Sequence, residues 1–293
     1  MKKNVLIIYN PKAGKNGAAH MLPYVVESLR KRDCRCVAQP VLSGYGAEEI
    51  LAEEDGRFET VVCRGGDGTL NHTINGLMSM EEKPRLIYLP TGSTNDFAAS
   101  LGLSRDIETA CSNIDGQPFY YDIGKFNDSY FNYVAAFGAF TKVSYSTPQE
   151  LKNQLGHAAY IIEGLRHLPI GQYHTATIIS EDRVFHGDFI YASVSNSTSI
   201  GGVSVPVKDE VSMNDGLFEV MLIKAPKSVM ELQSIITSML TQNFDNQYIS
   251  YFKTRNVQFS FTSPTPWTLD GEFGGDITEA KISVIDKAIG ILK

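Results

Sequence analysis

Residues 61–71 combine the residue types that a protein needs to hold a phosphate group. The segment reads VVCRGGDGTLN, which predicts the end of a strand, a turn of three glycines around Asp67, and then a helix. Glycine permits positive φ, so consecutive N–H groups can converge on an anion, and the helix adds its positive end. A carboxylate beside a phosphate implies a metal ion or ordered water between them. Taken alone, the motif fits an ordinary helix connection capped by Asp67 equally well.

Two more strand-to-helix turns of the same kind occur in the N-terminal part. A predicted strand at 86–89 leads into PTGSTND at 90–96, and the strand at 5–9 leads into NPKAGK at 10–15. Carboxyl ends of neighbouring parallel strands lie at one edge of a sheet, so we expect these loops to be neighbours. The chain has no Walker A pattern, and phosphates must therefore be held in another way.

Four motifs together resemble the diacylglycerol kinase catalytic-domain superfamily, most closely its soluble bacterial lipid kinases, which are relatives of sphingosine and ceramide kinases. They are NPxAG at 10–14, GGDGT at 65–69, PxGSxNDFA at 90–98 and LDGE at 269–272. GGDGT alone is shared with NAD kinases. All four motifs in this order, spread over nearly the whole chain, are far more specific.

The resemblance implies an ATP- and Mg²⁺-dependent kinase that phosphorylates a hydroxyl of a diacylglycerol-like lipid. It implies that Glu272 is the general base and that Asp67 also takes part in catalysis. Without it, Glu272 reads as a solvated residue after an Asp-Gly hairpin turn, and Asp122 reads equally well as a hydrogen-bond acceptor at a strand end. The implied nucleotide-binding residues are Asn10, Pro11, Gly14, Ser43, Gly65, Gly66, Asp67, Gly68, Thr69, Asn71, Ser93, Asn95, Asp96 and Asp122.

A second, structural Mg²⁺ is implied by the stretch SMNDGL at 212–217. The resemblance gives Asp215 as the carboxylate ligand and Ser212 and Leu217 as carbonyl ligands. Asn214 stands where some relatives have another acidic residue. Without the resemblance the stretch reads as an Asp-Gly turn before a strand.

The order of predicted elements indicates an α/β fold in two domains. Strands and helices alternate from residue 4 to about 114, which is typical of a mostly parallel, doubly wound nucleotide-binding domain. Later strands, at 173–180, 183–195, 218–223, 251–261 and 281–285, predict an antiparallel domain, sandwich-like or an open barrel, with helices at 151–168 and 229–244. A hairpin turning at 127–129 and continuing to 140 opens this part. We assign 1–124 to the first domain and 125–285 to a lipid-substrate domain, and expect 286–293 to return to the first.

Composition excludes several classes of protein. Twenty-six basic residues against 33 acidic residues give a net charge of −7, which argues against nucleic acid as a partner. No apolar run approaches the ~20 residues that span a bilayer, so we expect no transmembrane segment. The short apolar stretch at 5–9 reads as a core strand and not as a secretory signal. We expect a cytoplasmic protein that makes transient peripheral contact with a membrane surface to reach its lipid substrate; a homodimer is left open.

Two alternatives remain at the level of sequence. An NAD kinase-like phosphotransferase shares GGDGT, but the 10–14 and 90–98 motifs favour the lipid branch. A non-catalytic, nucleotide-sensing regulator would keep the fold and lose turnover. The joint presence of Asp67, Asp96 and Glu272 speaks against that reading.

Overall fold

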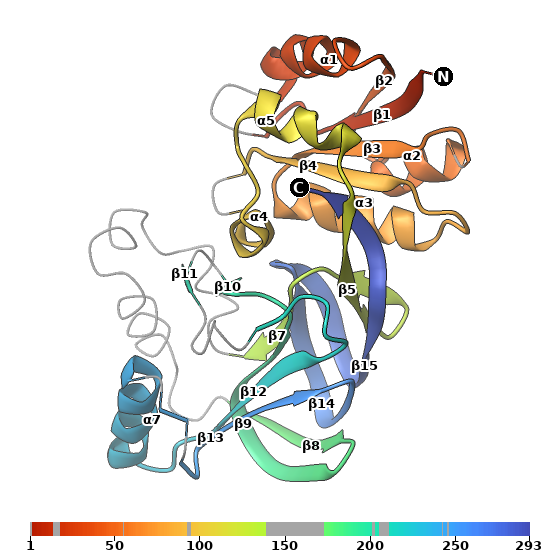
Figure 1. Ribbon diagram of the computed structural model, residues 1–293. Coiled ribbons are helices and arrows are strands. Elements are labelled where there is room, and N and C mark those ends of the chain that lie inside the picture. The colour runs from red at the N-terminus through yellow and green to blue at the C-terminus, as the bar shows by residue number, and fades with distance from the viewer. Residues whose placement is uncertain are drawn as a thin grey trace. The chain divides into compact units, whose positions relative to one another are not determined.

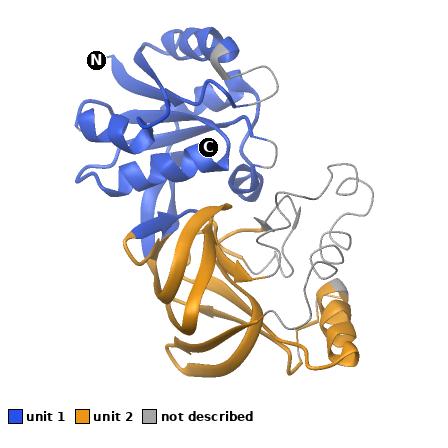
Figure 2. Ribbon diagram, turned by 180° about the vertical axis from the view of Figure 1, so that it is seen from behind, with its two compact units in different colours: residues 1–123, 129–132, 285–293 blue, residues 124–128, 133–284 orange. Residues whose placement is uncertain are grey.

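The protein divides into two compact units in the computed structural model (Figures 1 and 2). Unit 1 comprises residues 1–123, 129–132 and 285–293, and unit 2 comprises residues 124–128 and 133–284. Within these units the structure describes residues 2–13, 18–54, 56–92, 95–138, 173–200, 203–204, 211–241, 243–244 and 246–293. The helix predicted at 151–168 lies outside the described residues.

Unit 1 contains a parallel sheet in the order β4-β3-β1-β2. Its strands are β1 (Lys3–Tyr9), β2 (Cys34–Pro40), β3 (Thr60–Gly65) and β4 (Arg85–Pro90). The connecting helices are α1 (Leu22–Arg30), α2 (Ala47–Glu53), α3 (Asp67–Met78), α4 (Asp96–Leu101) and α5 (Ile107–Ser112), with 3₁₀ turns at Ala18–Met21 and Asn113–Asp115. The alternation of strands and helices that the sequence predicted is therefore present.

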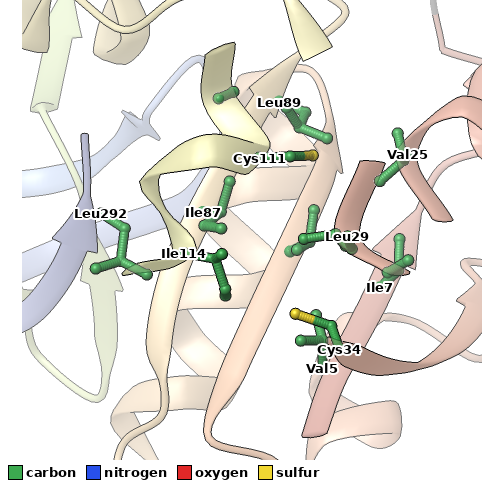
Figure 3. Packing of buried hydrophobic residues seen from close by; sticks show 12 residues of the cluster. Val5, Ile7, Val25, Leu29, Cys34, Ile87, Leu89, Cys111, Ile114 and Leu292 are labelled. Atoms are coloured by element: carbon green, nitrogen blue, oxygen red, sulfur yellow. The ribbon is translucent and has the colours of Figure 1, made fainter. Parts of the chain in front are cut away.

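The inner strands β1, β3 and β4 of the unit 1 sheet are buried on both faces. Val5 and Ile7 of β1 lie in one hydrophobic cluster with Leu29 of α1 and Cys111 of α5 (Figure 3). Successive side chains of a strand point to opposite faces, and Leu6 and Ile8 are also fully buried. Such two-sided burial explains the apolar runs of these strands, whereas the edge strand β2 is only partly buried.

Helix ends in unit 1 follow local side-chain chemistry. The Asp106 carboxylate accepts the Thr109 N–H at 2.8 Å and so caps the start of α5. Helix α4 ends at Gly102, which has φ of +64°, the left-handed conformation that glycine adopts most easily. Helix α3 begins at Asp67, so the carboxylate of the GDG turn lies in the first helical turn.

The chain passes between the units along two strands, β5 (Pro118–Phe126) and β15 (Glu272–Leu292). The last residues of β15 are buried in unit 1, where Ile291 pairs with Leu86 in parallel with β4. The predicted strand at 281–285 is only the middle of this 21-residue strand. The short strand β6 (Ser129–Phe131) pairs with β5, but the predicted hairpin arm to 140 is interrupted, because the following strand β7 (Val134–Gly138) pairs with other strands.

Unit 2 is built on antiparallel strands. They are β7, β8 (His174–Ser180), β9 (Arg183–Ser195), β12 (Phe218–Lys224), β13 (Ile249–Thr254), β14 (Asn256–Leu269) and the first part of β15. The long strands β9 and β14 each pair with β8 along one half and with β7 along the other, so these four strands close a circuit. Strands β12 and β13 extend the sheet from β9, and β15 pairs with β14. The sequence pattern predicted a sandwich-like or open-barrel arrangement for this part.

Aromatic side chains fill the interior of unit 2. Phe137, Phe259 and Trp267 are fully buried, and their ring centroids lie 5.0 to 6.0 Å apart. Such tilted aromatic contacts stabilise a core beyond the area they bury. The strand predicted at 251–261 is in fact two strands, β13 and β14, separated at Arg255.

The remaining described elements of unit 2 are a helix and a short ribbon. Helix α7 spans Val229–Thr241, close to the predicted 229–244, and the ribbon pairs β10 (Ser199–Ile200) with β11 (Val203–Ser204). Within the described residues, no helix combines the length and apolar character needed to cross a bilayer.

Candidate active site

The turn between β3 and α3 keeps ordinary backbone angles. Gly66 precedes the helix with φ of −89°, and Gly65 and Gly68 are not among the residues with positive φ. Our expectation that these glycines would take positive φ is therefore wrong. Gly65 is needed instead because another part of the chain approaches its backbone closely. A Cβ on Gly65 would lie 2.4 Å from the Thr69 Cβ. The Thr69 side chain packs directly on the turn.

The β3–α3 turn and the β4–α4 loop touch through their glycines. A Cβ on Gly92 would lie 2.9 Å from the Gly66 Cα, and a Cβ on Gly66 would lie 3.3 Å from the Gly92 Cα. The Thr91 N–H donates to the Gly65 carbonyl at 2.8 Å. Larger side chains cannot be accommodated here without displacement of backbone. The two loops therefore form a narrow, glycine-lined cradle at the carboxyl edge of two adjacent parallel strands.

A hydrogen bond joins the two aspartates of this cradle. The Asp96 N–H donates to Asp67 Oδ2 at 3.2 Å. Asp96 is 2 % exposed, and both aspartates lie in the first turn of their helices. A carboxylate fixed in this way can orient a hydrated divalent cation, because Mg²⁺ usually keeps several waters and takes one or two carboxylates.

Asn95 and Tyr88 shape the second loop. Asn95 adopts φ of +57°; its side chain accepts the Gly92 N–H at 2.9 Å and donates to the Gly92 carbonyl at 2.6 Å. The Tyr88 hydroxyl donates to Asn95 Oδ1 at 3.4 Å and to the Gly65 carbonyl at 3.3 Å. Burial raises the pKa of Tyr88 above its ordinary value, so it remains a neutral donor. We did not predict Tyr88, because in the sequence it reads only as a strand residue.

The first loop of unit 1 approaches the cradle through Asn10. Its backbone N–H donates to the Arg64 carbonyl at 3.0 Å, and its Nδ2 lies 3.5 Å from Thr69 Oγ1. Its Oδ1 accepts the Lys12 N–H at 3.0 Å, which fixes the turn around Pro11. Three of the predicted motifs are thus brought together. Gly14 and Ser93, also predicted to bind the nucleotide, lie outside the described residues.

Glu272 stands at a rigid turn of unit 2. Asp270 and Gly271 form the two-residue turn between β14 and β15, with φ of +52° and +89°, and Glu272 is exposed directly after it. Asp270 is 3 % exposed, and its Oδ1 accepts the N–H groups of Tyr133 at 2.9 Å and Val134 at 3.1 Å. Buried hydrogen bonds of this kind hold the turn, and with it the backbone of Glu272. Asp270 was missed as a site residue, because the sequence showed it only as half of an Asp-Gly turn.

Comparison with known proteins decides the family. The family model for the diacylglycerol kinase catalytic domain matches residues 4–126. A protein from Bacillus subtilis named diacylglycerol kinase is 30 % identical over 276 residues, which cover 93 % of this chain and 91 % of that protein. One of the same name from Staphylococcus epidermidis is 32 % identical over 283 residues, covering 94 % and 88 %. The chain belongs to the diacylglycerol kinase family.

A crystal structure of a diacylglycerol kinase from Bacillus anthracis has the same fold as this family member. Its TM-score is 0.77 at 22 % sequence identity, with 99 % of this chain and 96 % of that chain covered. The resemblance inferred from the four motifs is thereby confirmed at the level of family and fold.

Three other predicted nucleotide-binding residues of this diacylglycerol kinase homologue lie outside the cradle, and two of them make hydrogen bonds within the fold. Asn71 Nδ2 donates to the Tyr130 carbonyl at 3.3 Å, which ties α3 to β6. The fully buried Asp122 accepts the Lys287 N–H at 2.7 Å, where β15 has entered unit 1. Ser43 lies exposed in a tight turn closed by Leu42 and Tyr45. The contact of Asp122 is the one expected of a hydrogen-bond acceptor at a strand end, and nucleotide binding by these three residues stays a prediction.

Asp215, the carboxylate of the predicted structural Mg²⁺ site, contacts groups of the protein itself. Asp215 Oδ1 accepts the Leu217 N–H at 3.1 Å, and Asp215 Oδ2 lies 3.3 Å from the Lys253 ammonium. The Ser212 hydroxyl donates to Asn214 Oδ1 at 3.3 Å. Among the residues that the structure describes, no group of three or more His, Cys, Asp or Glu side chains could hold a metal ion. The predicted site has one carboxylate and two carbonyl ligands, so it stays a prediction.

Proposed function

We propose that this protein is an ATP-dependent lipid kinase that transfers the γ-phosphoryl group to a hydroxyl of a diacylglycerol-like lipid. Membership in the diacylglycerol kinase family supports a kinase. The observation that carries the proposal is the cradle formed by Gly66 and Gly92, with Asp67 beside it, whose carboxylate accepts the Asp96 N–H. Nucleotide phosphates need close backbone approach and a nearby metal-orienting carboxylate, and the cradle offers both.

In this proposal Mg·ATP, when bound, supplies the phosphoryl group and neutralises the charge that develops during transfer. The residues of unit 1 bind and orient it. Backbone N–H groups at the start of α3 face the phosphates, and Asp67 and Asp96 hold the hydrated metal ion. Thr91 supports this assignment, because its buried Oγ1 has no hydrogen-bond partner in the described structure and would gain one from a phosphate oxygen or a water.

We assign the general base to Glu272. Phosphoryl transfer requires mainly positioning and charge neutralisation, with a carboxylate to orient and deprotonate the attacking hydroxyl. An exposed carboxylate on a turn fixed by Asp270 meets this requirement, because it is held in place and open to an acceptor. The lipid acceptor lies in a membrane, so the protein would meet it at the membrane surface by transient peripheral contact.

The test is transfer of labelled phosphate from ATP to a panel of acceptors. Vesicles or mixed micelles would carry diacylglycerol, phosphatidylglycerol, ceramide or a sphingoid base, and a parallel assay would contain NAD. We expect label in the product of diacylglycerol above all others. Label in NAD would favour the NAD kinase alternative, and nucleotide binding without transfer to any acceptor would favour a regulator.

A further inference from the structure

A lysine connects two carboxylates in the part of unit 2 where a structural metal was expected. Lys253 of β13 lies directly opposite Glu219 of β12 in the strand register. Its Nζ lies 3.4 Å from Glu219 Oε1 and 3.3 Å from Asp215 Oδ2. The ammonium thus contacts a strand carboxylate and a turn carboxylate at the same time.

Burial makes this contact important for stability. Glu219 is 2 % exposed, so its carboxylate is removed from water, and the ion pair with Lys253 is only partly open to solvent. A buried carboxylate that loses its cation is strongly destabilising.

We propose that the Lys253 ammonium is the cation that holds the Asp215 turn against β12, and that it stands in place of the divalent ion expected there. If Mg²⁺ were also bound, the ion and the Lys253 ammonium would compete for Asp215 Oδ2. Mg²⁺ binds oxygen at about 2.1 Å. An ion at that distance from Asp215 Oδ2 would lie next to the ammonium, and the two like charges would repel each other.

The other carboxylate oxygens near this turn also have partners within the protein. Asp215 Oδ1 already accepts the Leu217 N–H, so this carboxylate has one oxygen facing the lysine and one in the turn. Glu219 faces the same ammonium. The turn before β12 is thus closed by an internal ion pair, and its stability should not depend on a metal. This inference is independent of the lipid that the protein phosphorylates.

The experiment is thermal melting of the nucleotide-free protein in EDTA and in millimolar Mg²⁺. For the wild-type protein we expect melting temperatures that agree within about 1 °C. Lys253→Met should melt at least about 5 °C lower in EDTA, because Glu219 keeps a buried charge without its cation. Mg²⁺ should then restore part of the loss, because the two carboxylates are free to share a divalent ion. Lys224→Met is the matched control: Lys224 is exposed at the end of β12, and this variant should melt like the wild type.

Two results would overturn the inference. One is an EDTA-induced fall in the melting temperature of the wild type that disappears in Asp215→Asn, which would mean that a metal is bound at Asp215. The other is a Lys253→Met variant that melts like the wild type. If that single variant does not fold, Glu219→Gln/Lys253→Met should fold and be insensitive to Mg²⁺, because neither charge is left; failure of this double variant to recover stability would equally contradict the ion pair.

Discussion

Two Asp-Gly pairs belong to the predicted site motifs, one in unit 1 and one in unit 2, and their aspartates make different contacts. In unit 1, Asp67 starts helix α3, and its carboxylate accepts an N–H from the neighbouring phosphate loop. In unit 2, Asp270 is buried in a left-handed turn, where its carboxylate accepts two strand N–H groups. The exposed carboxylate after that turn belongs to Glu272. In the proposed mechanism, the same dipeptide therefore supplies a binding group in one unit and supports the turn before the general base in the other.

This difference teaches that the dipeptide does not determine the role of its carboxylate. The role depends on which groups the aspartate side chain contacts. Asp270 is committed to backbone groups of its own unit, so the next carboxylate along the chain is left for chemistry. Asp67 keeps a position at the edge of the sheet, where a ligand can reach the loops. Substitutions in the two turns should therefore fail in different ways.

The largest effect is expected for Asp67→Ala. It should lower kcat by about 10³-fold or more, because the carboxylate that orients the metal beside the phosphates is lost. The glycine turn and the melting temperature should be little changed. Asp128→Ala, at an exposed turn, is the control and should keep normal turnover. A folded Asp67→Ala variant with more than about a tenth of wild-type kcat would remove Asp67 from the catalytic machinery.

Glu272→Gln should come next, with a fall in kcat of about 10²- to 10³-fold, within the range that general base catalysis contributes. Glutamine keeps the size of the side chain and loses its basicity. Steady-state turnover of the lipid acceptor measures the loss. The control is Glu279→Gln on the same strand, which also exchanges an exposed carboxylate and should have no effect. Equal kcat values for the two variants would make Glu272 a solvated turn residue.

Asp270→Ala should lower kcat by about 10-fold, because the turn that carries Glu272 loses its two anchoring hydrogen bonds. The melting temperature should fall as well, since the N–H groups of Tyr133 and Val134 would be left buried without an acceptor. Asp270→Asn is the diagnostic partner. Asparagine retains an acceptor oxygen and tolerates positive φ, so most of the activity should return. Wild-type turnover in the alanine variant would separate Asp270 from the positioning of Glu272.

The smallest effect is expected for Tyr88→Phe in unit 1. The hydroxyl bonds to Asn95 and Gly65 are long, at 3.4 and 3.3 Å. Their loss should lower the free energy of unfolding by about 1 kcal/mol and change kcat by less than about threefold. Denaturant unfolding and ATP-dependent turnover measure the two quantities. A loss of activity comparable with that of Asp270→Ala would mean that unit 1 also depends on a single anchoring residue.

The sequence predicted the parallel part of the fold well, because local signals and tertiary packing agree there. Each strand of unit 1 is an apolar run followed by a glycine turn and a helix, and this pattern is visible without coordinates. Unit 2 was harder. The break at Arg255 and the full length of β15 depend on pairings between distant strands, which residue patterns do not show.

The candidate site shows the same division. The Gly66–Gly92 approach follows from motifs that lie at neighbouring strand ends, so the sequence could place these loops together. The sequence could not show why these positions are glycines. A glycine that allows two backbones to approach looks the same in a sequence as one that adopts positive φ. Outside that site, the Lys253 contact with Glu219 arises from cross-strand register, which is not visible in the spacing of these residues along the chain.

The most direct test of the contrast between the two turns is calorimetric measurement of the nucleotide Kd in Asp67→Ala and Glu272→Gln, beside the wild type. A general base acts on the acceptor and not on ATP, so Glu272→Gln should bind nucleotide within about threefold of the wild type although its turnover is lost. Asp67→Ala should bind Mg·ATP at least about tenfold more weakly. Equal losses of nucleotide affinity in the two variants would contradict the account, because both carboxylates would then serve nucleotide binding.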